Sequence, residues 1–411
     1  MALKWKKKLS KLPLCVPPET CTDDYMVNSA AISDDGSRGV AGTYYFHYPG
    51  TTRVRSDGKF GTYCYSTSGK GKKLWADEYQ GDQGIYAVAI SGDGTVAAGA
   101  GLLNTGKFSP YRPRRGLLRV FQAATGAKLL DSSDFPGRVT SVSLSRNGGV
   151  LAAVAESSLY VFLRSASGSF STAPTEIDLD GYSPSVAVHP GGSWLAACDN
   201  MGKVYVSTIQ AGVVSQPATW TALERTEPLL PHSPLEAVKF NCVSVARASN
   251  SFAVGGGDFV YLFTLASIQG SPPAPVARFT SFDLSHHNVR FVAISDNGAF
   301  VTAVMNDKDL IGKPIGRLVK LSPSAGLLSE DWRATLKHPP NSTSIDSSGG
   351  FITAADGFPN PTPGAFYLFD NAGAKLWEHP TPAMNWPMVI SANGSGIAAG
   401  SDDNTLFFFT P

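Results

Sequence analysis

The sequence lacks long apolar runs and contains little charge, and both deficits narrow the possible folds and partners. No run of about 18 apolar residues occurs, so no membrane-spanning helix is expected. Only 16% of the 411 residues are charged and the formal net charge is +1, so no global field draws the protein to nucleic acid or to acidic membranes. The basic N-terminus is followed by prolines and not by the apolar core of a signal peptide. We therefore expect a cytoplasmic location, unless a leader has been removed.

Cysteine is sparse, and its spacing excludes several kinds of site. The five cysteines form no CxxC or CxxCH motif, so zinc, redox-pair and covalent-haem sites lack support. Cys15 and Cys21 lie six positions apart, and the sequence leaves open whether they form a disulfide or two free thiols. Cys64, Cys198 and Cys242 lie within apolar strand patterns, which indicates small core residues.

Glycine and proline are abundant, with 42 and 28 residues, and the segments between them are short, which is typical of a turn-rich β protein. One pattern recurs: an apolar alternation, a serine, a turn of Asp, Asn and Gly, and then a strand of small residues. Its eight copies imply repeats of about 51 residues, and the fifth copy is the weakest because it lacks the glycine. The copies lie at 31–36, 89–94, 143–148, 187–192, 245–250, 293–298, 344–349 and 389–394.

Each repeat is predicted to form four strands. The first carries the apolar alternation, and the Asp/Asn-Gly turn joins it to the second in a hairpin. The second strand is rich in small residues, as at 39–42 and 195–198. The third is aromatic and β-branched, as at 118–121 and 366–369, and the fourth is more polar, as suits an outer edge.

The two ends of the chain share one repeat. The last repeat, 386–411, contains only three strands, and the N-terminal segment at about 2–12 resembles the fourth strands at 71–75 and 373–377. Stacking four-stranded units around an axis buries each sheet against its neighbours. We therefore predict an all-β fold: a single domain over 1–411, built as an eight-bladed β-propeller whose last blade is closed by the N-terminal strand.

These motifs resemble two known families of repeats. The Ile-Ser-x-Asp-Gly core and the Val-Tyr-Leu-Phe strands resemble degenerate WD repeats, and the Gly-x-Lys-Leu-Trp strands resemble quinoprotein-type repeats, which favour eight blades. Quinone-dependent dehydrogenases of the latter type carry an adjacent Cys-Cys pair and a stacking tryptophan. This chain has no Cys-Cys dipeptide, and Trp5, Trp75 and Trp377 occupy outer-strand positions that suit packing between blades. No cofactor is expected, and the resemblance specifies fold and not function.

Candidate catalytic and metal-binding residues are few. Four histidines fall in segments that lead from one blade to the next and ring one mouth of the channel, but their spacing matches no metal motif, so no metal site is predicted. These are His232, His286, His287 and His338. Acidic residues recur in the loop after the second strand, where we expect them to cap backbone groups. They are Asp199, Asp258, Asp307, Asp356 and Asp402–Asp403. No serine-nucleophile elbow or phosphate loop occurs, and no catalytic residue is assigned.

Loop length is the strongest functional signal. The loop between the second and third strands is long in repeats one, two, six and seven, which cluster on one side of a ring that also contains repeat eight. These loops are rich in Arg, Tyr and Phe, which are typical of binding hot spots, although drift in surface loops is the alternative. The predicted partner-binding residues are Tyr48, Arg53, Arg55, Lys107, Phe108, Tyr111, Arg112, Arg114, Arg115, Lys313 and Phe358.

The function expected from these loops is non-catalytic. We expect an interaction or scaffold module whose protein partner offers an acidic segment, because charge-assisted bonds and aromatic packing suit such a surface. Nucleic acid is not expected, because the basic stretch is short and the net charge is near zero. The alternative is an enzyme, or a propeller that binds a small ligand or metal at the channel mouth, which requires polar groups that converge on one point.

Overall fold

A computed structural model describes residues 2–9, 24–46, 59–80, 84–103, 115–225, 235–280, 289–308, 313–357 and 363–411. Most of these residues lie in strands, and the described part contains a single short helix, α1 (Leu265–Ile268). None of the described helical residues forms a helix long and apolar enough to cross a membrane. The chain is therefore all-β, as the turn-rich composition predicts.

Consecutive strands pair into antiparallel sheets, in the order of the sequence. The first sheet contains β2 (Asp24–Ile32), β3 (Arg38–Phe46), β4 (Lys59–Ser66) and β5 (Lys72–Gln80). The second contains β6 (Gly84–Ile90), β7 (Val96–Leu103), β8 (Arg115–Gln122) and β9 (Lys128–Phe135). The third contains β10 (Val139–Leu144), β11 (Val150–Ala155), β12 (Ser158–Leu163) and β13 (Thr175–Asp178).

The middle of the chain departs most from this regular scheme. The outer strand next to β16 is divided between β17 and β18, and a parallel bridge between Arg278 and Leu327 joins the sheet of β21–β24 to that of β25–β28. The strands are β14 (Ser185–Val188), β15 (Trp194–Cys198), β16 (Lys203–Gln210), β17 (Val213–Val214), β18 (Ala218–Thr221), β21 (Phe240–Val245), β22 (Ser251–Gly256), β23 (Phe259–Thr264), β24 (Ala277–Thr280), β25 (Val289–Ile294), β26 (Val301–Lys308), β27 (Pro314–Ser324) and β28 (Leu327–Leu336). A separate pair, β19 (Leu223–Arg225) and β20 (Leu235–Ala237), was not predicted.

The last two sheets involve both ends of the chain. One contains β29 (Pro340–Ile345), β30 (Phe351–Asp356), β31 (Gly364–Asp370) and β32 (Lys375–Thr381). The other contains β33 (Asn385–Ile390), β34 (Ile397–Ser401) and β35 (Thr405–Thr410), and its outer strand is β1 (Ala2–Lys8). β1 pairs antiparallel with β35, with Trp5 opposite Phe408, so the predicted pairing of the N-terminal strand is observed.

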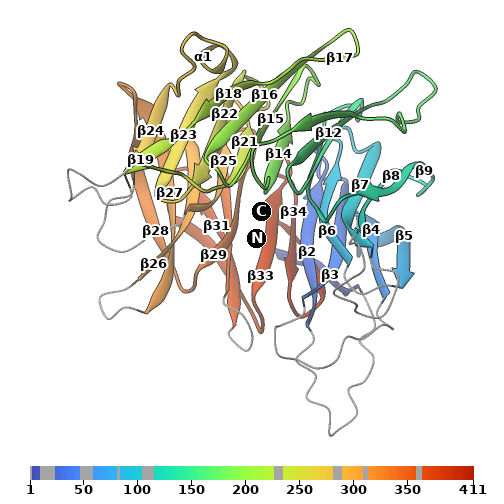
Figure 1. Cartoon of the computed structure of the whole chain (residues 1–411). Helices are drawn as coiled ribbons and strands as arrows, with labels where there is room; N and C mark the ends of the chain where they lie inside the picture. The colour runs from blue at the N-terminus through green and yellow to red at the C-terminus, as the bar shows by residue number, and fades with distance from the viewer. Residues whose placement is uncertain are drawn as a thin grey trace, which may run out of the picture.

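The sheets stand side by side around a common centre, with both termini near it in the view of Figure 1. Their first strands face this centre, and an asparagine on three of them reaches a backbone carbonyl on the first strand of the next sheet. Asn28, Asn241 and Asn341 donate from Nδ2 at 2.6–2.8 Å, to Tyr86, Val289 and Asn385 respectively. This arrangement is a β-propeller, in which polar side chains of the inner strands link neighbouring sheets.

The second strands require small residues because they are compressed between neighbouring sheets. All residues of β11 and β15 are buried, and most are Ala, Val or Leu. A Cβ added at Gly99 would lie 1.9 Å from Thr62 Oγ1, and one added at Gly42 would lie 2.5 Å from Ile85 Cγ2. The recurring Ala and Gly therefore set how closely the sheets approach one another. Cys64, Cys198 and Cys242 are free and buried, which confirms their interpretation as core residues.

Tryptophans on the outer strands pack against the next sheet, as predicted. Trp75 on β5 lies 4.7 Å from the ring of Phe121 and donates from Nε1 to Ala123 O at 2.8 Å. Trp377 on β32 lies 4.6 Å from the ring of Phe409. Trp5 on β1 stacks on Phe408 at 5.4 Å and reaches Tyr65 of the β2–β5 sheet at 5.5 Å. These indoles therefore join neighbouring sheets at their outer strands. We call each such contact region between two sheets a junction.

Candidate functional site

The turn between the first two strands has the same construction in most sheets. Ser33 donates from its hydroxyl to Asp35 Oδ1 at 2.6 Å, and Ser91 donates to Asp93 Oδ1 at 2.6 Å. The Asp35 carboxylate also accepts from the backbone N–H of Ser37, and Gly36 follows with a φ of 70°, which favours glycine. Burial alone would raise the pKa of the Asp35 carboxyl. The hydrogen bonds outweigh this effect and hold the pKa below its ordinary value. The recurring Ser-x-Asp/Asn-Gly motif thus fixes the turn.

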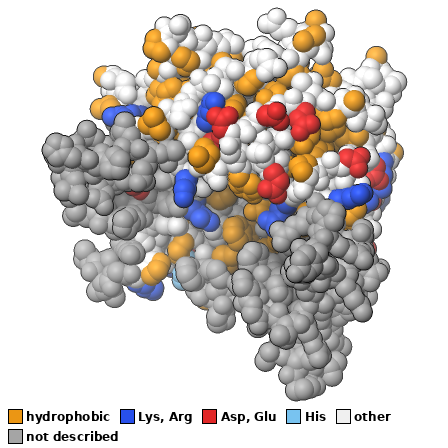
Figure 2. Space-filling view, viewed as in Figure 1, with side chains coloured by type: hydrophobic (Ala, Val, Ile, Leu, Met, Phe, Trp, Pro, Cys, Tyr) orange, Lys and Arg blue, Asp and Glu red, His pale blue; other side chains and the backbone are white. Residues whose placement is uncertain are grey.

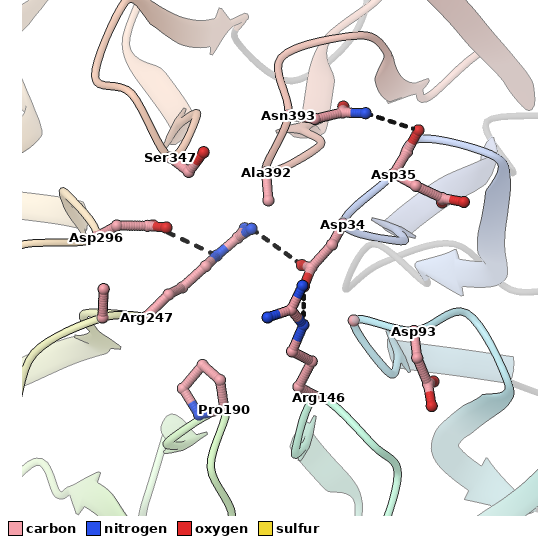
Figure 3. Close-up of a pocket in the computed structure, with 12 residues that line it drawn as sticks. Asp34, Asp35, Asp93, Arg146, Pro190, Arg247, Asp296, Ser347, Ala392 and Asn393 are labelled. Carbon is pink, nitrogen blue, oxygen red and sulfur yellow. Dashed lines mark hydrogen bonds and ion pairs between the residues drawn. The ribbon is translucent and has the colours of Figure 1, made fainter.

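The second residue of each turn faces the channel, and together these residues form what we call the channel mouth. They are Asp34, Gly92, Arg146, Pro190, Arg247, Asp296, Ser347 and Ala392. They line a cavity of about 490 Å³ together with their neighbours. Figure 3 shows the turns around this cavity, with the side chains of Asp34, Arg146, Arg247 and Asp296 directed into it.

Backbone hydrogen bonds join successive turns around the mouth. They run from an N–H in one turn to a carbonyl in the next, at 2.7–3.0 Å. The pairs are Asp34 to Gly92, Asp93 to Arg146, Arg146 to Pro190, Ala248 to Asp296, Ser347 to Ala392, and Asn393 to Asp34. The last pair joins the final turn of the chain to the first. Asn393 Nδ2 strengthens that join by donating to Asp35 O at 3.0 Å.

Four charged side chains form one ion network across the mouth (Figure 3). Asp34 accepts from Arg146 Nε and from Arg247 Nη1, each at 3.0 Å. Arg247 Nε lies 3.7 Å from Asp296 Oδ1. Arg247 and Asp34 are separated by 213 positions in sequence, so this contact spans the ring. Burial raises the pKa of Asp296 although Arg247 opposes the shift.

The ion network at the channel mouth was not predicted from the sequence. The turn motif itself is predicted from the sequence. Its second position varies between Asp, Gly, Arg, Pro, Ser and Ala, so no interaction between these side chains was predicted. Asp34 was interpreted only as a turn residue, and Arg146 and Arg247 were not singled out. An opposite-charge set at equivalent positions of the repeat was the signal that could have revealed the network.

Of the four histidines considered as metal ligands, the structure describes His338 alone. His338 is half-buried and donates its backbone N–H to Asp356 Oδ2 at 3.0 Å, while His232, His286 and His287 lie outside the described residues. Within the described ranges, no three His, Cys, Asp or Glu side chains are grouped so that they could hold a metal. Because Asp356 is the last residue of β30, His338 lies at the end of the sheets opposite to the turns of the channel mouth.

The predicted role of the loop aspartates is confirmed at Asp199, Asp356 and Asp403, the last of which accepts from the backbone N–H of Thr405 at 3.1 Å. Asp199 Oδ1 accepts from the backbone N–H groups of Met201 and Lys203, and its Oδ2 accepts from the hydroxyl of Tyr205. Asp356 accepts in the same manner from Ala365 N and Tyr367 Oη. These buried carboxylates therefore hold the loop between second and third strands, and Asp307 pairs with Arg317.

The predicted partner-binding loops leave the sheets at the end opposite to the channel mouth. β3, β7, β26 and β30 each begin beside a turn of the mouth and end where one of these loops begins. We call this end of the sheets the loop face. Arg115 opens β8 and pairs with Leu103, Lys313 directly precedes β27, and both side chains are exposed there.

The other predicted partner-binding residues lie outside the described residues. They are Tyr48, Arg53, Arg55, Lys107, Phe108, Tyr111, Arg112, Arg114 and Phe358. Cys15 and Cys21 also lie outside, so the question of their disulfide stays open. On the face shown in Figure 2, the described basic and acidic side chains are interspersed, which agrees with the net charge of +1.

No family model matches the sequence, and no curated protein matches it. Solved structures resemble it in fold. Sqt1 of Chaetomium thermophilum, bound to the N-terminus of the ribosomal protein L10, has a TM-score of 0.65 at 14% identity, over 94% of this chain and 97% of that chain. A second Sqt1 structure from the same organism has a TM-score of 0.64 at 14% identity, over 94% and 95%.

A further likeness extends to another protein. The β-propeller domain of Cps50 (Swd1) from Myceliophteria thermophila has a TM-score of 0.53 at 10% identity, over 79% of this chain and 95% of that domain. At such identities the likeness speaks for fold alone. It supports the β-propeller fold, and the resemblances to WD repeats and to quinoprotein-type repeats stay predictions.

Proposed function

We propose that the protein is a non-catalytic interaction module that binds a segment of a partner protein through its loop face. Its scaffold is proposed to be a single domain over 1–411, an eight-bladed ring closed by the pairing of β1 with β35. The turns at the channel mouth support this blade count, because equivalent turn positions recur with the repeat and backbone bonds run between them, including from Asn393 back to Asp34. The cytoplasmic location expected from the sequence belongs to this proposal.

One observation carries the proposal of a protein partner. The fold matches that of Sqt1 over 94% of this chain, and the matched Sqt1 structure holds the N-terminus of a ribosomal protein. A WD-type propeller offers a rigid ring whose loops present side chains to a peptide without much loss of entropy on binding. Because folds host unrelated functions, this inference concerns the mode of binding and not the identity of the partner.

The loop face is the proposed binding surface. Arg, Lys, Tyr and Phe are concentrated in the loops that leave β3 and β7, which belong to consecutive sheets. Arg112, Arg114 and Arg115 lie close to Pro110 and Pro113, which restrict the backbone and lower the entropy lost on docking. An acidic segment of the partner suits these side chains, because guanidinium groups bind carboxylates in a bidentate manner.

The channel mouth supports a second candidate function, the binding of a small charged ligand. A cavity of about 490 Å³ lies within the size range of ligand pockets. The groups around it are already engaged, however: Asp34 binds two arginines, and Asp93 binds Ser91 and Thr95 of its own turn. A ligand therefore has to compete with these internal contacts, and we rank the loop face first.

The proposed function is tested by replacing Arg112, Arg114 and Arg115 with serine together. The partner is first identified by cross-linking and co-purification, and its bound segment is synthesised as a labelled peptide. We expect the triple variant to bind this peptide at least about tenfold more weakly and to lose much of the salt dependence of binding. Exposed substitutions should change stability by about 0.5 kcal/mol or less each.

The matched control is the variant Lys70→Ser, Lys72→Ser, Lys73→Ser, which removes the same number of charges from a different, exposed region. It should bind the partner peptide as the wild type does. If the arginine variant melts at a lower temperature and still binds normally, these arginines belong to the fold and the binding surface lies elsewhere.

A further inference from the structure

Lysines gather where the outer strands of the first and last sheets meet. Lys4 and Lys7 belong to β1, and Lys72 and Lys73 belong to β5, with Lys70 in the turn that precedes it. All are exposed except Lys7, which is half-buried. We call these five residues the lysine surface. It lies on the rim of the ring, apart from both the channel mouth and the loops of the proposed function.

The packing of Trp5 brings the two strands together. A Cβ added at Gly71 would lie 2.3 Å from Trp5 Cε2, so the indole rests directly on the backbone between Lys70 and Lys72. Lys73 is paired with Tyr65, whose ring lies 5.5 Å from that of Trp5. Directly opposed residues share one face of a sheet, so Lys73 lies on the face that meets β1.

The β1 lysines lie on the matching side. Lys7 is paired with Leu406, which belongs to the same buried cluster as Trp5 and Tyr65. Lys4 Nζ lies 5.6 Å from the centroid of the Phe408 ring, on which Trp5 also stacks. Lysines of two sheets therefore converge at one junction, although the two segments lie more than 60 positions apart in sequence.

These lysines are not neutralised by the described part of the protein. None of the five forms an ion pair with a described residue, whereas the next junction carries compensated charge: Arg119 binds Asp77 at 2.7 Å and Asp131 at 3.0 Å. Like charges that converge without counter-charges repel one another, and an anionic partner relieves that repulsion.

A second observation at the same junction points to a missing acceptor. Trp5 is only 8% exposed, and its Nε1 has no hydrogen-bond partner among the described residues. At equivalent junctions, Trp75 donates to Ala123 O at 2.8 Å and Trp332 donates to Asn371 O at 3.0 Å. Buried donors in folded proteins are nearly always satisfied, so the described contacts of this junction, which lies beneath the lysine surface, are less complete than those of the other two.

We propose that the lysine surface binds an extended acidic peptide segment, which adds as a further strand to the open edge of β1. β1 ends its sheet, and no described strand pairs with its outer edge, which is the kind of edge to which an extended peptide can add as a further strand. In an added strand, alternate side chains point to the same face, where carboxylates at every second position meet Lys4, Lys7 and Lys73. Lys70 and Lys72 extend the positive charge along the neighbouring edge.

A nucleic acid is a poorer fit to this surface. Single strands of RNA or DNA are held by aromatic side chains on which bases stack, in addition to positive charge. The aromatic residues here, Trp5 and Tyr65, are 8% and 5% exposed and are covered by their own packing. Lysines on edge strands also prevent sheets from joining edge to edge, and the experiment separates that role from binding.

The probe is a fluorescein-labelled peptide in which Glu and Thr alternate over eight residues, measured by fluorescence anisotropy against the full chain. We expect it to bind more tightly than a peptide of the same composition with four Glu followed by four Thr, because only the alternating peptide places its carboxylates on one face. The variant Lys70→Ser, Lys72→Ser, Lys73→Ser should weaken binding about tenfold. N-methylation of alternate backbone nitrogens in the probe should weaken it as strongly, because a strand then loses its ladder bonds.

The controls separate this surface from the loop face. The variant Arg112→Ser, Arg114→Ser, Arg115→Ser should bind the alternating peptide as the wild type does, so the two proposals fail or survive independently. A peptide affinity that is equal in wild type and lysine variant overturns the inference, as does equal affinity for the alternating and block peptides. If a 12-nucleotide single-stranded RNA binds more tightly than the peptide and displaces it, the surface recognises nucleic acid and the proposal is wrong.

Discussion

The indole N–H of the outer-strand tryptophans distinguishes junctions that otherwise pack alike. Trp75 donates from Nε1 to Ala123 O, whereas Trp5 has no acceptor for Nε1 among the described residues. Replacing either residue with phenylalanine keeps an aromatic ring on the neighbouring sheet. We expect Trp75→Phe to lower the free energy of unfolding by about 1–2 kcal/mol beyond the loss of ring area, because the Ala123 carbonyl then keeps only the weaker thiol donor of Cys64.

Trp5→Phe is the matched comparison. It removes a buried donor that is already unsatisfied, so its cost should be smaller than that of Trp75→Phe, by about 1 kcal/mol. The measurement is chemical denaturation of both variants beside the wild type. Equal losses of stability in the two variants would show that the N–H contributes nothing and that ring area alone decides the outcome.

The role of a single residue was predictable where the same residue type recurs at the same position of several repeats. The caps at Asp199 and Asp356 and the junction role of Trp75 followed from their places in the repeat. The pair of Asp34 with Arg247 did not, because its partners occupy the same repeat position 213 residues apart. Only the curvature of the ring brings these two side chains together, and no local pattern encodes it.

At the scale of elements, β1 is the strand whose removal should have the largest effect for its length. Deleting residues 1–9 exposes the outer edge of β35 and the apolar face that includes Phe408. We expect a markedly lower melting temperature and concentration-dependent association, because an unpaired apolar edge invites pairing with another chain. Thermal unfolding and light scattering measure both effects.

The substitution Trp5→Ala separates packing from strand pairing. It should cost about 3–5 kcal/mol through the cavity it leaves and should keep the protein monomeric, because the ladder between β1 and β35 remains. A truncated protein that stays monomeric with an unchanged melting temperature would mean that β1 does not close the ring.

The order of the strands was predictable because period-two alternation and turn residues recur in most repeats. The division of the outer strand into β17 and β18, the pair β19–β20 and the helix α1 were not. All three follow the third strand of a sheet and precede the first strand of the next, so they lie towards the outside, where the chain can vary without disturbing the packed interior. α1 depends on a local capping box, in which Thr264 and Ser267 bond each other's backbone.

At the scale of the whole molecule, burial at the channel mouth destabilises the ionised form of the Asp296 carboxyl. Burial raises the pKa of this carboxyl above its ordinary value, so folding disfavours its ionised form. Such a group lowers stability at pH values above its folded pKa, and the loss is relieved as the pH falls through that pKa. We expect Asp296→Asn to be more stable than the wild type at about pH 7, and the difference to shrink as the pH falls towards the ordinary aspartate pKa of about 3.9. A stability difference that does not change with pH would contradict this assignment.

The ion pair of Asp34 with Arg247 is expected to brace the ring across its diameter, since it joins turns of the first and fifth repeats. A double-mutant cycle with Asp34→Asn and Arg247→Met should give a coupling energy of about 0.5–1 kcal/mol that declines at high salt. The cycle with Arg146→Met should give less, because the Arg146 side chain is 68% exposed against 33% for Arg247, and water screens it more strongly.

The control for this brace is Asp93→Asn in a neighbouring turn. The corresponding turn of the third sheet already uses an asparagine, since Asn147 accepts from Ser145 at 2.9 Å and from Gly149 N at 2.9 Å. Asp93→Asn should therefore change stability little and show no dependence on salt. If Asp34→Asn behaves like Asp93→Asn, the ring is held by its backbone bonds and sheet packing alone, and the charges at the mouth are left available for a ligand.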